Sequence, residues 1–220
     1  MAAATAHAAG VNLAWDPCYG DALPLVRKLF ACDRNSGLKA VVASFVPAIN
    51  HPNSSLLEIQ FDIQTRSGGT LPVWSDFATS SRCRRNLISI DGSPPEPVVV
   101  CQKTSASTVP LFIILRDNFQ FRTPDHMVLV ASANAGSQPL VAGGKYLARR
   151  LLISHACTVL AGACRGCLEP VAISLSQLRV SGGAPETLST PAGGNVVAWQ
   201  QELPVAARNT TWAAVKSLYR

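Results

Sequence analysis

The chain has 220 residues, of which 48% are hydrophobic and 15% are charged. This composition supplies a sizeable core and excludes an intrinsically disordered chain. Because all-β sandwiches and barrels reach this length as one unit, we expect a single domain. The net charge of +6 does not form a long basic stripe interleaved with aromatics, so we do not expect nucleic-acid binding. The sequence also has no apolar run of about 18 residues, which a transmembrane helix needs.

The first residues are similar to the end of a signal peptide. Small residues lead to Ala6-His7-Ala8, a small-x-small pattern of the kind that precedes a cleavage site. A basic start and a long apolar centre are missing from this stretch, so a disordered alanine-rich terminus is the alternative. We expect 1–8 to be a residual signal-peptide end or a disordered leader, and 9–220 to be one β-sandwich domain.

Apolar, β-branched runs bounded by Pro, Gly, Asn or Ser predict about nine strands. The clearest lies at 56–64, where Leu57, Ile59 and Phe61 alternate with polar residues, a pattern typical of a half-buried strand. The segment 23–31 stays open between a short helix and an extended segment. In chain order, the expected strands are 40–46, 56–64, 86–90, 98–101, 109–115, 127–131, 146–154, 171–180 and 195–199.

Turn residues separate these strands, and no strand-helix-strand rhythm appears, which argues against a parallel α/β sheet. Near the end, Asn209 is a good helix cap, and Trp212, Val215 and Tyr219 fall on one face of a helix over 210–219. We therefore predict an all-β fold, an antiparallel β-sandwich or jelly roll with a short C-terminal helix.

Seven cysteines would be unusual as free thiols in a reducing cytosol, so we expect disulfides and an oxidising compartment. Closing the loop from Cys18 to Cys32 would contribute about 3 kcal/mol in the chain-entropy model. Other local pairings are Cys83 with Cys101 and Cys164 with Cys167, although spacing alone does not fix the connectivity. The disulfide candidates are Cys18, Cys32, Cys83, Cys101, Cys164 and Cys167.

A zinc site is the competing interpretation of one cysteine-rich segment. Four zinc ligands could come from His155, Cys157, Cys164 and Cys167. Structural zinc sites usually combine two separated ligand pairs, so a local disulfide is the favoured interpretation and we expect neither a metal nor a cofactor.

Blocks of aromatic, cysteine, proline and glycine residues lie toward both ends of the chain. They include W-x-x-C at 15–18, F-A-C-x-x-N-x-G at 30–37 and T-W-x-x-V-K-S-L-Y-R at 211–220. Together they resemble a group of uncharacterised secreted bacterial β-rich proteins with no established activity. The resemblance implies export and a β-rich fold, and it implies that Cys157 is the odd thiol.

Nucleophilic catalysis needs a Ser or Cys beside a base, which is usually His. The four histidines are expected in the leader (His7), in a loop (His51), at the start of a strand (His126) and within a strand (His155). No G-x-S-x-G elbow surrounds any serine. We therefore expect no catalytic residues and no enzyme activity.

The function predicted from these patterns is a non-catalytic, secreted, periplasmic or cell-surface β-sandwich with a structural or surface-interaction role. Its partner would be an extracellular glycan or a surface protein. The first alternative is a carbohydrate-binding module in which the loop aromatics Trp74 and Phe77 stack on sugars; a plug at the end of the sandwich is the other role for these rings. The second alternative is an unrecognised extracellular hydrolase.

Overall fold

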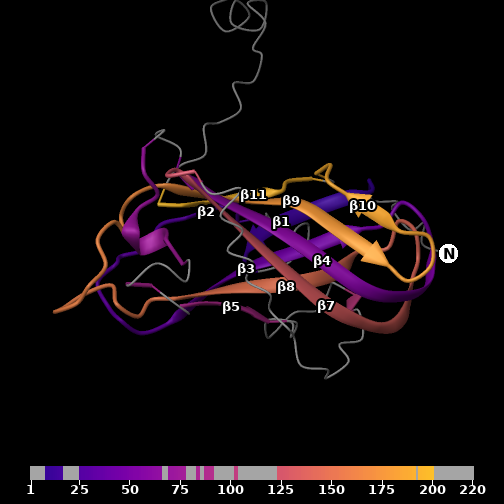
Figure 1. Ribbon diagram of the computed structural model, residues 1–220, viewed down its shortest axis with the longest axis horizontal. Coiled ribbons are helices and arrows are strands. Elements are labelled where there is room, and N and C mark those ends of the chain that lie inside the picture. Colours follow the sequence, from indigo (N-terminus) through magenta and orange to yellow (C-terminus); the bar gives the residue numbers. More distant parts are fainter. Residues whose placement is uncertain are drawn as a thin grey trace, which may run out of the picture.

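The computed structural model describes residues 8–16, 25–65, 69–77, 83–84, 87–91, 102–103, 123–191 and 193–200. Within these ranges the regular structure is two β-sheets and one short 3-10 helix, η1 (Val73–Ser75) (Figure 1). The prediction of an all-β sandwich is therefore confirmed. Residues 1–7 of the leader predicted at 1–8, the strands predicted at 98–101 and 109–115, and the predicted C-terminal helix lie outside the described residues.

The first sheet is five-stranded in the part of the chain that the structure describes. All its pairings are antiparallel except that of β6 with β8. The strands run in the order β1 (Gly10–Trp15), β3 (Leu38–Val46), β8 (Tyr146–Ser154) and β5 (Ile88–Asp91), with β6 (Gln102–Lys103) also on β8.

The second sheet is six-stranded over the same described ranges, and only β2 and β11 pair in parallel. The strands run in the order β2 (Arg27–Lys28), β11 (Val196–Trp199), β9 (Val171–Ser181), β4 (His51–Thr65) and β7 (His126–Leu140), with β10 (Glu186–Leu188) also on β9.

Strand β4 shows why this sequence forms a sandwich. The apolar residues Leu57, Ile59, Phe61 and Ile63 are at most 1% exposed, because period-2 alternation turns them all toward the core. The strand begins at His51, earlier than its alternation indicated. Register shifts of its pairing with β7 fall in this early part, where irregular pairing accommodates a polar stretch that breaks the alternation.

Strand β1 joins the edges of the two sheets. It pairs with β3 along its whole length, while the Leu13 amide donates to the Gly194 carbonyl at 2.7 Å and the Trp15 Nε1 donates to the Ala198 carbonyl at 3.1 Å. All six residues of β1 are buried. The strand therefore closes one side of the core.

The strand registers divide the loops between two ends of the sandwich. Leu38 pairs with Ser154, and Thr65 pairs with Val171, so the segments 29–37, 69–77 and 155–170 meet at one end. We call this end, together with 83–84, the disulfide end; its loops lie on the left in Figure 1. The turns 47–50, 141–145 and 182–185 lie at the opposite end.

The turn after β9 provides a test of this packing. Gly182 and Gly183 both have a positive φ, of 109° and 111°. A Cβ at Gly182 would overlap the backbone of Asn53 and Ser55, whereas a Cβ at Gly183 meets open space. We expect Gly182→Ala to lower the free energy of unfolding by about 2 kcal/mol more than Gly183→Ala does. Urea denaturation measures both; equal losses would contradict this close approach.

Candidate functional site

Two disulfides tie the loops of the disulfide end together. Cys32 is bonded to Cys167, and Cys83 to Cys164, across sequence separations of 135 and 81 residues. Disulfides were expected, but their partners are distant because packing of the two sheets brings separate loops side by side. The local pairings suggested by spacing are therefore wrong: Cys18 with Cys32, Cys83 with Cys101, and Cys164 with Cys167. Cys18 and Cys101 themselves lie outside the described residues.

The alternative zinc set does not form. It required thiolates from Cys164 and Cys167, and both sulfurs are bonded to other cysteines, so they cannot act as zinc ligands. Among the described residues no group of three or more His, Cys, Asp or Glu could hold a metal ion. Of the cysteines in those ranges, only Cys157 lies outside a disulfide, and the resemblance assigned the odd thiol to this position.

Removing the longer bridge tests the connectivity. Non-reducing peptide mapping is expected to recover Cys32 linked to Cys167 and Cys83 linked to Cys164. The double variant Cys32→Ser/Cys167→Ser should lose about 2–5 kcal/mol of unfolding free energy, because the unfolded chain regains freedom. Cys157→Ser serves as the control and should change stability by less than about 1 kcal/mol. A peptide that joins Cys164 to Cys167 would refute the assignment.

The structure places Trp74 and Phe77 in the core, where they are 1% and 4% exposed. A ligand platform was one of the two roles expected for these rings, but neither ring presents a face to solvent, so that alternative is wrong. Both rings pack on Arg84 instead, whose guanidinium carbon lies 4.0 Å from the Trp74 ring centre and 5.2 Å from that of Phe77. They act as the end plug that was the other expectation for these aromatics.

Arg84 is fully buried and holds the beginning of the 155–170 loop. Its guanidinium donates to the carbonyl of Ser154 at 2.5 Å and to that of Ala156. Burial lowers the pKa of Arg84 to about 10, so the group is still charged at neutral pH. A buried charge without partners costs several kcal/mol. Here the carbonyl dipoles and the face of the Trp74 ring compensate the charge of the guanidinium.

An aromatic layer lies beneath the loops. Phe30 stacks on Trp199 with ring centres 3.8 Å apart, and Trp74 packs on Trp199 at 4.3 Å. The indole N–H groups also reach the loop: Trp199 donates to the Cys167 carbonyl at 2.8 Å, and Trp74 donates to the Thr158 hydroxyl at 3.1 Å. The 155–170 loop is therefore fixed although it contains no strand or helix.

Asn35 connects the 29–37 segment to the same loop. Its Oδ1 accepts from the amides of Thr158 and Val159 at 2.7 and 2.9 Å, and its Nδ2 donates to the Val159 carbonyl at 3.0 Å. The His155 amide donates to the Gly37 carbonyl at 3.0 Å. These four bonds hold the two segments against each other.

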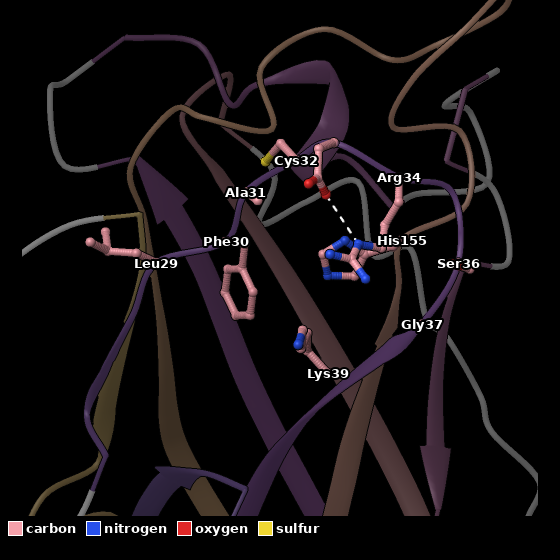
Figure 2. A pocket seen from close by; sticks show the side chains of 10 residues that line it. Leu29, Phe30, Ala31, Cys32, Arg34, Ser36, Gly37, Lys39 and His155 are labelled. Carbon is pink, nitrogen blue, oxygen red and sulfur yellow. Dashed lines mark hydrogen bonds and ion pairs between the residues drawn. The ribbon is translucent and has the colours of Figure 1, made fainter.

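A pocket of about 260 Å³ opens between these segments. One wall is the stretch from Leu29 to Lys39, and the other is His155 (Figure 2). Phe30 provides a buried aromatic surface, while Arg34 and Lys39 bring positive charge. The pocket is small by the standard of drug-sized ligands.

His155 lies in the wall of the pocket and is 5% exposed. Its ring contacts Phe30, Trp74 and Trp199 at centroid distances of 5.7 to 6.1 Å. Both ring nitrogens are buried and have no hydrogen-bond partner within the described ranges. Burial, and then the positive charges of Lys39, Arg84 and Arg34, lower the pKa of His155, opposed only in part by Asp33. The imidazole is therefore neutral at pH 7.

This lowered pKa predicts a loss of stability in acid. The unfolded chain binds a proton near pH 6.5, whereas the folded protein resists protonation until a lower pH, so stability falls as the pH falls below 6.5. His155→Phe keeps a ring in the aromatic layer and removes this effect. Between pH 7 and 5, the free energy of unfolding from urea denaturation should fall more steeply with decreasing pH in the wild type than in His155→Phe. The difference in slope should reach up to about 1.4 kcal/mol per pH unit. Parallel slopes would contradict a neutral buried imidazole.

The other two described histidines pair with carboxylates. His51 was expected in a loop, but it begins β4, and its Nε2 lies 2.7 Å from a carboxylate oxygen of Glu186. His126 begins β7, as expected, and its Nε2 lies 3.0 Å from Asp62. Neither contact joins an imidazole to a hydroxyl or a thiol, which is the arrangement that activates a nucleophile.

The comparisons with known proteins add no relative. No protein-family model, no curated protein and no solved structure matches the chain. In the part of the chain that the structure describes, no helix has the length and apolar character to span a membrane.

The pocket residues were not among the predicted site residues, apart from His155 and Cys32. Arg34, Lys39 and Ser36 carry no catalytic spacing, and each is an ordinary surface residue in isolation. A signal was nevertheless present in the F-A-C-x-x-N-x-G block, because its Asn35 makes the loop contacts and its Gly37 has a φ of 104°, which favours glycine.

Proposed function

We propose that the protein is a non-catalytic, extracytoplasmic β-sandwich that recognises a surface partner through its disulfide end. The observation that carries this proposal is the ordering of the 155–170 loop by two disulfides and two buried indoles. Long loops without secondary structure are usually functional or disordered, and this one is fixed. Fixed loops on a rigid scaffold lose little entropy when they bind.

Exposed apolar side chains support the choice of this end. Large apolar side chains stand in solvent on three of its segments, with exposed fractions from 51% to 83%. These residues are Leu29, Val73, Leu160 and Leu168. Apolar groups near a polar pocket are typical of a surface that binds another molecule.

The two disulfides support the export part of the proposal. Two disulfides persist in an oxidising environment and are rare in the cytosol. The proposed locations are the periplasm, the cell surface and the extracellular space, and the proposed partners are an extracellular glycan or a surface protein.

A matched pair of substitutions tests the proposal. Leu160 is 83% exposed at the disulfide end and has a positive φ, which asparagine tolerates, while Val141 is 61% exposed at the opposite end. Wild type, Leu160→Asn and Val141→Asn are applied to glycan arrays and to purified envelope proteins. We expect Leu160→Asn to weaken binding about tenfold, which is 1.4 kcal/mol, and Val141→Asn to leave it unchanged.

Two results would overturn the proposal. One is binding that is lost in Val141→Asn and retained in Leu160→Asn, because the partner would then use the opposite end. The other is turnover of ester, peptide or glycoside substrates by the purified protein, because that activity would make it the hydrolase that the sequence offered as an alternative.

A further inference from the structure

The wall of the pocket carries an excess of positive charge. Arg34 and Lys39 line it, and the fully buried Arg84 binds the carbonyls of Ser154 and Ala156, on either side of His155. Asp33 is the one acidic residue of the lining, and its carboxylate contacts Arg34 Nε at 3.1 Å. This contact leaves the two terminal amino groups of the guanidinium for another acceptor.

The His155 imidazole adds an unmet hydrogen-bonding capacity. A neutral imidazole has one N–H donor and one acceptor nitrogen, and neither nitrogen has a partner in the described part of the chain. A buried polar group without a partner costs about 1–3 kcal/mol. Such a group in a native protein calls for an explanation, and a ligand in the adjoining pocket is one.

From this geometry we propose that the pocket binds a small oxyanion, the carboxylate, phosphate or sulfate group of a compact molecule or of the surface partner. This inference deepens the proposed recognition function and rests on it. Arg34 and Lys39 supply the charge, the Ser36 hydroxyl and the His155 N–H supply further donors, and the Phe30 ring packs against the body of the ligand.

The pocket is preorganised for such a ligand. The Cys32–Cys167 bridge and the bonds of Asn35 fix the wall that carries Arg34. The backbone of Lys39 belongs to β3, and its Nζ lies 5.3 Å from the Phe30 ring centre. Little order therefore has to be gained when the anion enters, which favours affinity. The volume of about 260 Å³ limits the ligand to a small group.

Coupling to His155 gives the proposal a distinctive signature. The cations Lys39, Arg84 and Arg34 disfavour the imidazolium, and Asp33 alone favours it. A bound anion offsets those cations, so it should raise the pKa of His155. By linkage, the anion should bind more tightly as the pH falls through the titration of this group.

The test uses the full chain with inorganic phosphate, sulfate and acetate as separate probes, and chloride as the ionic-strength control. Lys39→Gln and Arg34→Gln are expected to weaken binding of the preferred probe about tenfold, as befits a charge-assisted contact. Arg179→Gln removes the same charge from an exposed site on β9 and should have no effect. The preferred probe should also shift the His155 titration measured by NMR to higher pH.

The three probes distinguish the source of the anion, and any one that shows this pattern supports the proposal. Absence of binding for all three at millimolar concentrations would overturn it, as would equal weakening by Arg179→Gln, which indicates general charge screening. Circular dichroism confirms that each variant is folded. Because partner binding is measured separately with Leu160→Asn, a pocket that binds no anion leaves the recognition proposal standing, and turnover of substrate removes that proposal without removing the pocket.

Discussion

The structure of the disulfide end depends on finding hydrogen-bond partners for the backbone of a long connection that pairs with no strand. Between β8 and β9 the chain runs through 155–170 without a strand or helix, yet much of it lies over the core. Each of its polar backbone groups that is buried needs a partner from elsewhere. Side chains supply several of these partners: the Arg84 guanidinium binds the Ala156 carbonyl and that of Ser154 at the end of β8, the Trp199 indole binds the Cys167 carbonyl, and Asn35 binds two amides.

These partners explain why the end combines residues that are rarely buried with the largest aromatic side chains. Arg84 reaches its carbonyls only from inside, where its charge requires compensation, and the Trp74 face provides part of it. Burial, then the positive charges of Lys39 and Arg84, lower the pKa of His155. One requirement of the backbone thus contributes to the electrostatics of the pocket wall above it.

Much of the sandwich could be predicted from local patterns. The strand at 146–154 has the predicted limits, and 171–180 and 56–64 lie within β9 and β4, because apolar alternation reports directly on a half-buried strand. The second half of β7 was missed, since it consists of small and polar residues that follow β4 by backbone pairing. Strand β1 was missed although Val11, Leu13 and Trp15 alternate, and it is buried on both faces.

The site could be predicted far less well, because it consists of contacts between segments far apart in the chain. Cysteine spacing favours local bridges, whereas the observed pairs are set by which loops the sheets bring together. A loop tryptophan such as Trp74 can serve either as a binding platform or as an end plug, and only the packing of its ring in the core and on Arg84 shows which role it has. Arg34 and Lys39 become candidate site residues only because they line one pocket with His155, which lies more than 100 positions further along the chain.

The two bridges also impose an order on folding. Cys32 and Cys83 are synthesised well before Cys164 and Cys167, so neither native bond can form until the chain has been made as far as the 155–170 loop. During that interval the early thiols can pair only with each other or with other early cysteines, and such bonds must later be exchanged by thiolate attack. The wide sequence separation of the two pairs therefore makes the native bonds late ones, and a disulfide isomerase would accelerate the exchange of any premature bond.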